Sequence, residues 1–199
     1  MSLHRRCFTN VSRKGIVLFL TMLPVAVFLG TGIVCADEKT TIRKYPIPGH
    51  GTFEFNVPAS WKVKVHKPQE NLPPTIIFSP AKGNNFEVTI SMMESKTGES
   101  GFNKQDRVRT LVEKDAQKLL PNTVETKIVL NEIKGINHTG YYFSVTDKAP
   151  DPGEYRYMTR AGIGVGNLLL NTTILHRVKE SGAVNEALSM LRQARQTPK

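Results

Sequence analysis

The chain alternates apolar and polar side chains with a period of two on both sides of Pro58. Phe53, Phe55 and Val57 occupy every second position, which places them on one face of a β-strand. Pro58 cannot donate a hydrogen bond to a neighbouring strand, so the pattern predicts a break there. A second alternating run begins at Trp61, the only Trp of the chain. We expect Trp61 to anchor the core, with a ligand-stacking role as the alternative.

Further runs predict a sheet of many antiparallel strands. An alternation over 86–92 follows a short apolar run at 75–79, and the Gly and Asn residues between them are typical of a hairpin turn. The run at 168–178 is the most apolar, so we expect it at the centre of the sheet. The other predicted strands are 127–133, 141–145 and 154–165.

Two segments instead carry apolar residues at the spacing of an α-helix. The first spans 103–120, with Asn103 as its predicted N-cap and Pro121 at its end. The second spans 183–195, with Arg192 and Arg195 on its outer side. The order of strands, helix, strands and helix predicts an α+β fold in which both helices pack against an antiparallel sheet.

The first 36 residues have the pattern of a secretory signal peptide. A basic segment precedes an uncharged, mostly apolar run at 16–34, and we expect cleavage between Ala36 and Asp37. The run is long enough to span a membrane, so an uncleaved inner-membrane anchor is the alternative. Cleavage would remove both cysteines, Cys7 and Cys35. An exported chain without cysteine fits a bacterial periplasm, or secretion, better than a eukaryotic extracellular space.

These patterns divide the chain into three parts. Residues 1–36 form the signal peptide, residues 37–50 form an extended polar leader that is partly mobile, and residues 51–199 form a single domain. The mature length suits one domain with its own core. We expect a monomer.

The charge balance is basic, at +10 for the whole chain and +6 without the signal peptide, which holds four of the 27 Lys and Arg. No Arg-rich arm or basic stripe with interleaved aromatics is present in the sequence, so nucleic acid is not expected as a partner. Weak contact with an anionic membrane surface or an acidic partner is expected, and the alternative is that the charges only keep the helices soluble. The residues expected to make this contact are Lys104, Arg107, Lys114, Lys118, Arg192 and Arg195.

Motifs that would indicate a chemistry are weak. Gly162-x-Gly164-x-Gly166 lacks the spacing and the following helix of a phosphate-binding loop, so it indicates a strand near a hairpin end. The histidines of the mature chain do not have metal-ligand spacing, so neither a metal nor another cofactor is expected. No catalytic residue is predicted, although Glu54 or His138 would serve a hydrolase whose site is scattered over strands.

Three residues are the candidates for a binding site: Arg156, Arg160 and His138. Two arginines on one face of a strand would hold an anionic group. The alternative is that Arg156 and Arg160 pair with carboxylates such as Glu54 or Glu87, and a solvated His138 in a hairpin turn is ordinary.

The motif Thr52-Phe-Glu-Phe-Asn-Val-Pro-Ala-Ser-Trp61 and the order of elements that follows it resemble the PsbP-like superfamily. The resemblance extends from about Ile47 to Arg195. It implies an α/β/α sandwich around an antiparallel sheet, and an exported bacterial member of the superfamily. Known members mostly bind protein partners and are not enzymes, but their contact residues match no motif of this chain.

The sequence thus predicts an exported, non-catalytic binding or accessory protein of the bacterial cell envelope, which acts through contacts with a protein partner. A carrier of a small anionic or lipidic ligand is one alternative, and an enzyme with a scattered site is another. Partner, ligand and organism do not follow from the sequence.

Overall fold

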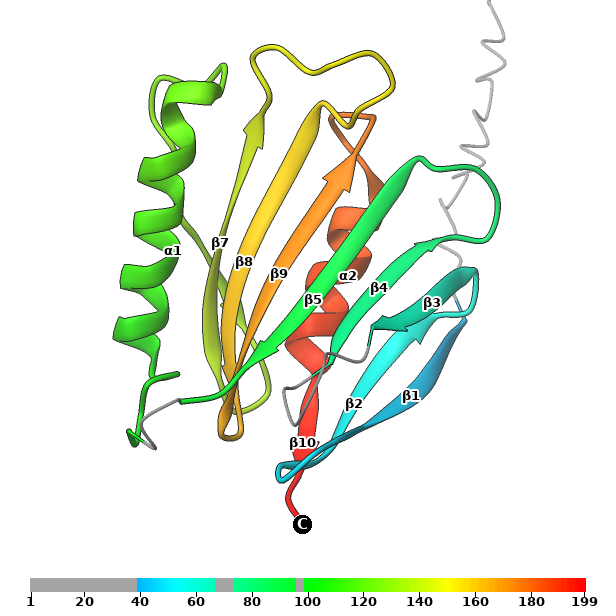
Figure 1. Cartoon of the computed structure of the whole chain (residues 1–199), viewed down its shortest axis with the longest axis vertical. Coiled ribbons are helices and arrows are strands. Elements are labelled where there is room, and N and C mark those ends of the chain that lie inside the picture. The colour runs from blue at the N-terminus through cyan, green and yellow to red at the C-terminus, as the bar shows by residue number, and fades with distance from the viewer. Residues whose placement is uncertain (1–38, 67–73, 96–98) are drawn as a thin grey trace, which may run out of the picture. The chain divides into compact units, whose positions relative to one another are not determined.

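The computed structural model describes residues 39–66, 74–95 and 99–199 (Figure 1). The predicted signal peptide, with its alternative as a membrane anchor, lies outside the described residues. The larger of two sheets has seven strands in the order β3-β4-β5-β9-β8-β7-β6, and all neighbours run antiparallel. Its strands are β3 (Trp61–His66), β4 (Thr75–Pro80), β5 (Phe86–Met93), β6 (Asn131–Lys134), β7 (Thr139–Thr146), β8 (Tyr157–Val165) and β9 (Leu168–His176).

The apolar strand β9 lies in the middle of this sheet, between β5 and β8, as predicted. It pairs with β5 from Phe86↔His176 to Met93↔Leu169 and with β8 from Tyr157↔His176 to Val165↔Leu168. The strand predicted at 127–133 is shorter and later than expected, since only residues 131–134 pair with β7.

A second sheet of three strands was not predicted. Its order is β1-β2-β10, with β1 at Thr40–Ile47, β2 at Gly51–Pro58 and β10 at Arg195–Thr197. The prediction of a partly mobile leader at 37–50 is therefore wrong for most of that segment. Residues 40–47 of this segment are extended, pair with β2 and bury Tyr45 and Ile47, so they belong to the domain.

The two long helices are α1 (Gln105–Leu119) and α2 (Gly182–Gln193), and the 3₁₀ turn η1 (Leu120–Asn122) follows α1. The prediction of Asn103 as an N-cap is wrong. The N-cap position is Lys104, and the Asn103 side chain instead donates to the carbonyls of Gly166 and Leu168, both at 3.0 Å. The last helix also ends earlier than predicted, because Arg195 already pairs with Glu54 in the small sheet.

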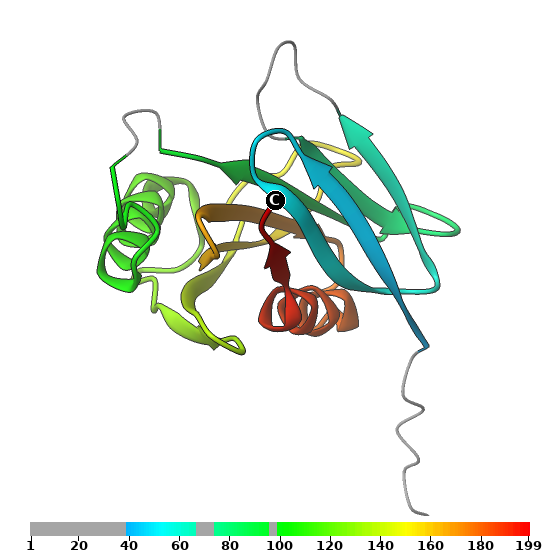
Figure 2. The ribbon, with the colours of Figure 1, turned by 90° about the horizontal axis from the view of Figure 1, so that it is seen from below.

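Helices α1 and α2 lie on opposite faces of the seven-stranded sheet (Figure 2). Val108, Val112 and Ala116 of α1 pack on the face that carries Tyr141 and Phe143. The other face of the sheet packs against α2 and the aromatic residues of β2, which together form the larger core. The predicted arrangement of helices around an antiparallel sheet is confirmed, with the small sheet as an addition on the α2 side.

Candidate functional site

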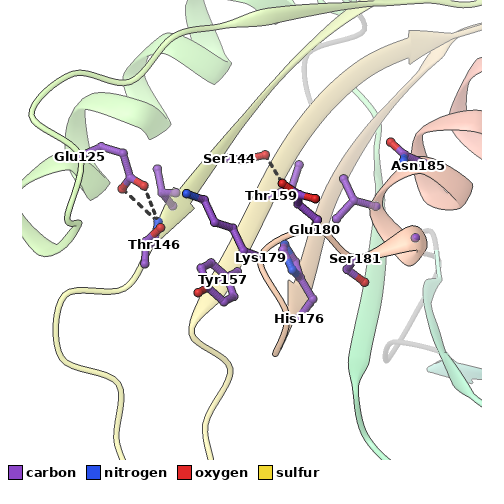
Figure 3. Close-up of a pocket in the computed structure, with 13 residues that line it drawn as sticks. Glu125, Ser144, Thr146, Tyr157, Thr159, His176, Lys179, Glu180, Ser181 and Asn185 are labelled. Atoms are coloured by element: carbon purple, nitrogen blue, oxygen red, sulfur yellow. Dashed lines mark hydrogen bonds between the residues drawn. The ribbon is translucent and has the colours of Figure 1, made fainter.

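A pocket of about 630 Å³ lies where α2 begins, against β7, β8 and β9 (Figure 3). The alternation along β8 explains its polar floor. Ala161, Ile163 and Val165 are buried in the larger core, whereas Thr159 and Tyr157, on the same side of the strand, reach the pocket. Ser144 on β7 and His176 on β9 complete the floor. The strands therefore place polar side chains on the α2 side of the sheet, at the start of that helix.

Hydrogen bonds fix two parts of the pocket. The hydroxyls of Ser144 and Thr159 are 2.8 Å apart and bond to each other. On the other side, both carboxylate oxygens of Glu125 accept from the Thr146 backbone N–H, at 3.1 and 2.9 Å. Burial raises the pKa of Glu125, but these hydrogen bonds outweigh burial and hold the pKa below its ordinary value. Glu125 is therefore ionised at neutral pH.

His176 is the most buried ionisable residue of the pocket, with 3% of its surface exposed. Its Nδ1 lies 2.7 Å from the carbonyl oxygen of Val178 and donates to it, so Nε2 carries a lone pair. Burial lowers the pKa of His176, opposed by this bond, and the imidazole is neutral at pH 7. Its Nε2 is buried without a hydrogen-bond partner among the described residues. The ring stacks on Tyr157 with centroids 5.5 Å apart.

The first turn of α2 forms a wall of the pocket. Ser181 is the N-cap and makes no side-chain capping bond, so its hydroxyl does not occupy the N–H groups that open the helix. Lys179 and Glu180 stand in the segment just before it, and both line the pocket. The site thus combines donors, acceptors and charges of both signs, which suits the binding of a small polar molecule.

A second candidate surface lies on the opposite face of the seven-stranded sheet. Helix α1 packs there on β7, β8 and Leu169 of β9, and the described residues leave the rest of that face half-buried. The residues that alternate with the core positions of β4, β5 and β9 include the apolar Ile77, Met93 and Leu175 and the acidic Glu87. Six others are hydroxyl-bearing or amide side chains: Thr75, Ser79, Thr89, Ser91, Asn171 and Thr173. We call all of these residues, with Lys62 and Lys64 of β3, the open face.

The basic side of α1 borders the open face. Asp115 points from α1 to Arg160 on β8, with Nη2 to Oδ2 at 3.0 Å, and Arg160 pairs in register with Thr173 of the open face. Lys118 is three residues from Asp115, and Lys114 is four residues from Lys118, so both lie on the same side of the helix. Arg107, on that side as well, is paired with Glu99 at 2.6 Å.

The structure separates the predicted site residues. Arg160 forms an ion pair with Asp115. Pairing with a carboxylate was the alternative to anion binding, but the carboxylate belongs to neither Glu54 nor Glu87. Arg156 lies before β8 begins and is exposed, so the two arginines do not share a strand face. Glu54 is instead paired with Lys44 at 2.7 Å.

His138 lies in the turn between β6 and β7 and is half-buried rather than solvated. Its Nε2 lies 3.4 Å from the Leu191 carbonyl oxygen of α2, and burial lowers its pKa. His138 does not line the pocket at α2.

Comparison with protein families and with curated proteins finds no match. Two solved structures are similar. A crystal structure from Bacteroides thetaiotaomicron VPI-5482 has a TM-score of 0.50 and 18% identity, over 79% of this chain and 49% of that chain. The solution structure of cyanobacterial PsbP (CyanoP) from Synechocystis sp. PCC 6803 has a TM-score of 0.49 and 10% identity, over 85% of this chain and 99% of that chain.

The match to the Bacteroides structure, with a TM-score of 0.50, shows a shared fold. The chain spans about half the length of the Bacteroides structure. At these identities the likeness is one of fold alone, and a shared fold does not carry a function with it.

No helix in the described part of the chain combines the length and apolar character that a membrane crossing needs. Among residues 39–66, 74–95 and 99–199, no three His, Cys, Asp or Glu gather where they would hold a metal ion.

The pocket at α2 was missed by sequence reasoning. His176 was considered only for metal-ligand spacing, and no local pattern marks Ser144 on β7 or Tyr157 and Thr159 on β8. One feature of the sequence did indicate the pocket. Thr159 and His176 are polar, but they occupy strand positions whose alternation predicts buried apolar residues. A buried polar residue in an otherwise apolar alternation is the feature that points to such a site.

Proposed function

We propose that this chain is an exported, non-catalytic binding protein of the bacterial envelope, and that the open face beside α1 holds an acidic surface of a protein partner. The observation that carries the proposal is the open half of a central sheet bordered by basic side chains. A face of hydroxyl and amide groups makes hydrogen bonds without a large desolvation cost, and the surrounding lysines select acidic partners.

The charges around this face favour an acidic partner. Arg107 and Arg160 are neutralised by Glu99 and Asp115, whereas Lys114 and Lys118 have no ion-pair partner among the described residues. With Lys62 and Lys64 at the β3 edge, positive charge stands on both sides of the open face, and Glu87 on β5 is the one carboxylate between them among the described strand residues of this face. Such charges act mostly on encounter and on salt sensitivity, because attraction between exposed charges fades beyond about 8 Å at physiological salt.

The first test reverses two of these charges. Binding of poly-L-glutamate at low salt is expected to weaken about tenfold in Lys114→Glu/Lys118→Glu, since each exposed charge contributes on the order of 0–1 kcal/mol. The matched control is Lys134→Glu/Lys148→Glu, whose exposed lysines lie on β6 and in the loop after β7. Fluorescence anisotropy of labelled peptide across a salt series measures both variants.

Two outcomes count against the proposal. An equal loss in both double variants would show a general charge effect instead of a defined face. Vesicles of phosphatidylglycerol that bind with the same sensitivity to Lys114 and Lys118, while poly-L-glutamate does not bind, would identify an anionic membrane as the occupant.

The export part of the proposal has its own measurement. Protein recovered from the periplasmic fraction is expected to have the intact mass of a chain that begins at Asp37, because Val34-Cys35-Ala36 presents small residues to signal peptidase. A mass that retains residues 1–36, together with recovery in the membrane fraction, would instead support the uncleaved anchor.

A further inference from the structure

We infer that the pocket at the start of α2 binds a neutral polyhydroxylated molecule, such as a small sugar, between the Tyr157–His176 pair and the first turn of the helix. This site lies on the α2 side of the sheet, opposite the open face. The experiments on the two sites therefore have independent outcomes, and a negative result for one does not affect the other.

His176 defines what the ligand must offer. Because its Nδ1 proton is used by the Val178 carbonyl, Nε2 can only accept a hydrogen bond while the ring is neutral. In Figure 3 the His176 ring points from the end of β9 toward the side of the pocket that holds Thr159. A buried acceptor left without a donor is costly, so a ligand group with a proton to give is favoured here. A hydroxyl has that proton, whereas a carboxylate would place a lone pair against a lone pair.

The other polar groups also match hydroxyls better than an anion. Both oxygens of Glu125 accept from the Thr146 backbone N–H, and a carboxylate has about four lone-pair sites, so it can accept from ligand donors as well. The hydroxyls of Ser144 and Thr159 both donate and accept, and the N–H groups at the start of α2 donate. A molecule with several hydroxyls satisfies donors and acceptors together, because each hydroxyl is both.

Charge argues in the same direction. Among the described residues, Lys179 is the only cationic side chain that lines the pocket, while Glu125 and Glu180 contribute two carboxylates. An anionic ligand would therefore meet a surface that is negative overall, despite the favourable N-terminus of α2. A neutral ligand pays no such cost.

Tyr157 provides the apolar part of the site. Its ring is half-buried, lines the pocket and is held by stacking on His176 at an interplanar angle of 20°. A fixed aromatic ring offers an apolar surface of defined orientation, on which the C–H face of a sugar ring can lie. The volume of about 630 Å³ is in the range of small-molecule sites.

The experiment titrates the full chain with glucose, N-acetylglucosamine, maltose and chitobiose, with acetate and inorganic phosphate as anionic probes. Saturation-transfer NMR and calorimetry are expected to show binding of at least one sugar. Tyr157→Ala is expected to weaken it about tenfold or more, and Ser144→Ala about fivefold. Tyr155→Ala is the matched control, because Tyr155 contacts Arg177 and does not line the pocket.

Melting temperatures of all variants separate loss of binding from loss of folding. Ser144 is exposed, so Ser144→Ala keeps the test valid even if Tyr157→Ala loosens the sheet. The inference is overturned if no sugar binds, if binding is as sensitive to Tyr155→Ala as to Tyr157→Ala, or if acetate or phosphate displaces the sugar and binds more tightly.

Discussion

Replacing Trp61 by alanine is expected to lower the free energy of unfolding by about 3–5 kcal/mol, as large-to-small substitutions of buried aromatic residues do. Trp61 is 5% exposed and packs on two rings, with its centroid 4.8 Å from that of Phe86 and 6.0 Å from that of Phe78. Its removal leaves a cavity at the start of β3, where the chain has just passed from β2 of the small sheet into the large sheet. Urea denaturation followed by circular dichroism measures the change.

Val65→Ala in the same strand is the control, because this side chain is 41% exposed and its loss is expected to change stability by less than about 0.5 kcal/mol. A Trp61→Ala protein that melts like the parent but no longer binds its partner would contradict the structural role. It would show instead that Trp61 contacts the partner.

The sequence predicted the large elements because each has a local pattern with a clear period. The alternation at 51–66, the helical stripe at 103–120 and the apolar run at 168–178 were each sufficient to assign an element. The same patterns led to the α+β class and to the central place of β9, both of which the structure confirms.

The short elements were missed because long-range contacts stabilise them. Strand β10 has three residues and no periodic pattern, and it exists because the end of α2 brings Arg195 opposite Glu54. Strand β1 is largely polar and exposed on one side, so its composition resembles a loop, and its pairing with β2 decides its structure. Tertiary contacts of this kind override local propensity.

The candidate sites were harder to predict than the fold. The pocket at α2 combines residues from β7, β8, β9 and the start of the helix, and only the topology brings them together. The open face follows from where α1 stops covering the sheet, which no residue pattern encodes. Arg160 was recognised as a candidate, but its partner Asp115 lies in the helix and not in a strand.

The glycines of β8 belong to the Gly162-x-Gly164-x-Gly166 motif, and the packing of the sheet against α1 explains why two of them are glycine. Gly162 and Gly164 lie on the face that α1 covers, and a methyl group at Gly162 would come within 2.8 Å of Val112. At Gly164 the contact is with backbone, because an added Cβ would lie 2.1 Å from the carbonyl oxygen of Asn103. The motif that resembled a phosphate-binding loop therefore makes room for the segment that leads into α1.

Gly164→Ala is accordingly expected to destabilise the protein by about 2–4 kcal/mol, at or above the usual range for overpacking, because a backbone carbonyl cannot rotate away like a flexible side chain. Any shift of Asn103 also disturbs its two bonds to the carbonyls of Gly166 and Leu168, which tie the start of α1 to the turn between β8 and β9.

The matched substitution is Gly182→Ala at the start of α2, where an added Cβ meets nothing within 4 Å. It is expected to be neutral or to stabilise by about 0.4–1 kcal/mol, since alanine reduces the entropy of the unfolded chain. Thermal and urea unfolding of the two variants side by side measures the difference. Equal stability of Gly164→Ala and Gly182→Ala would show that the segment before α1 does not rest on β8.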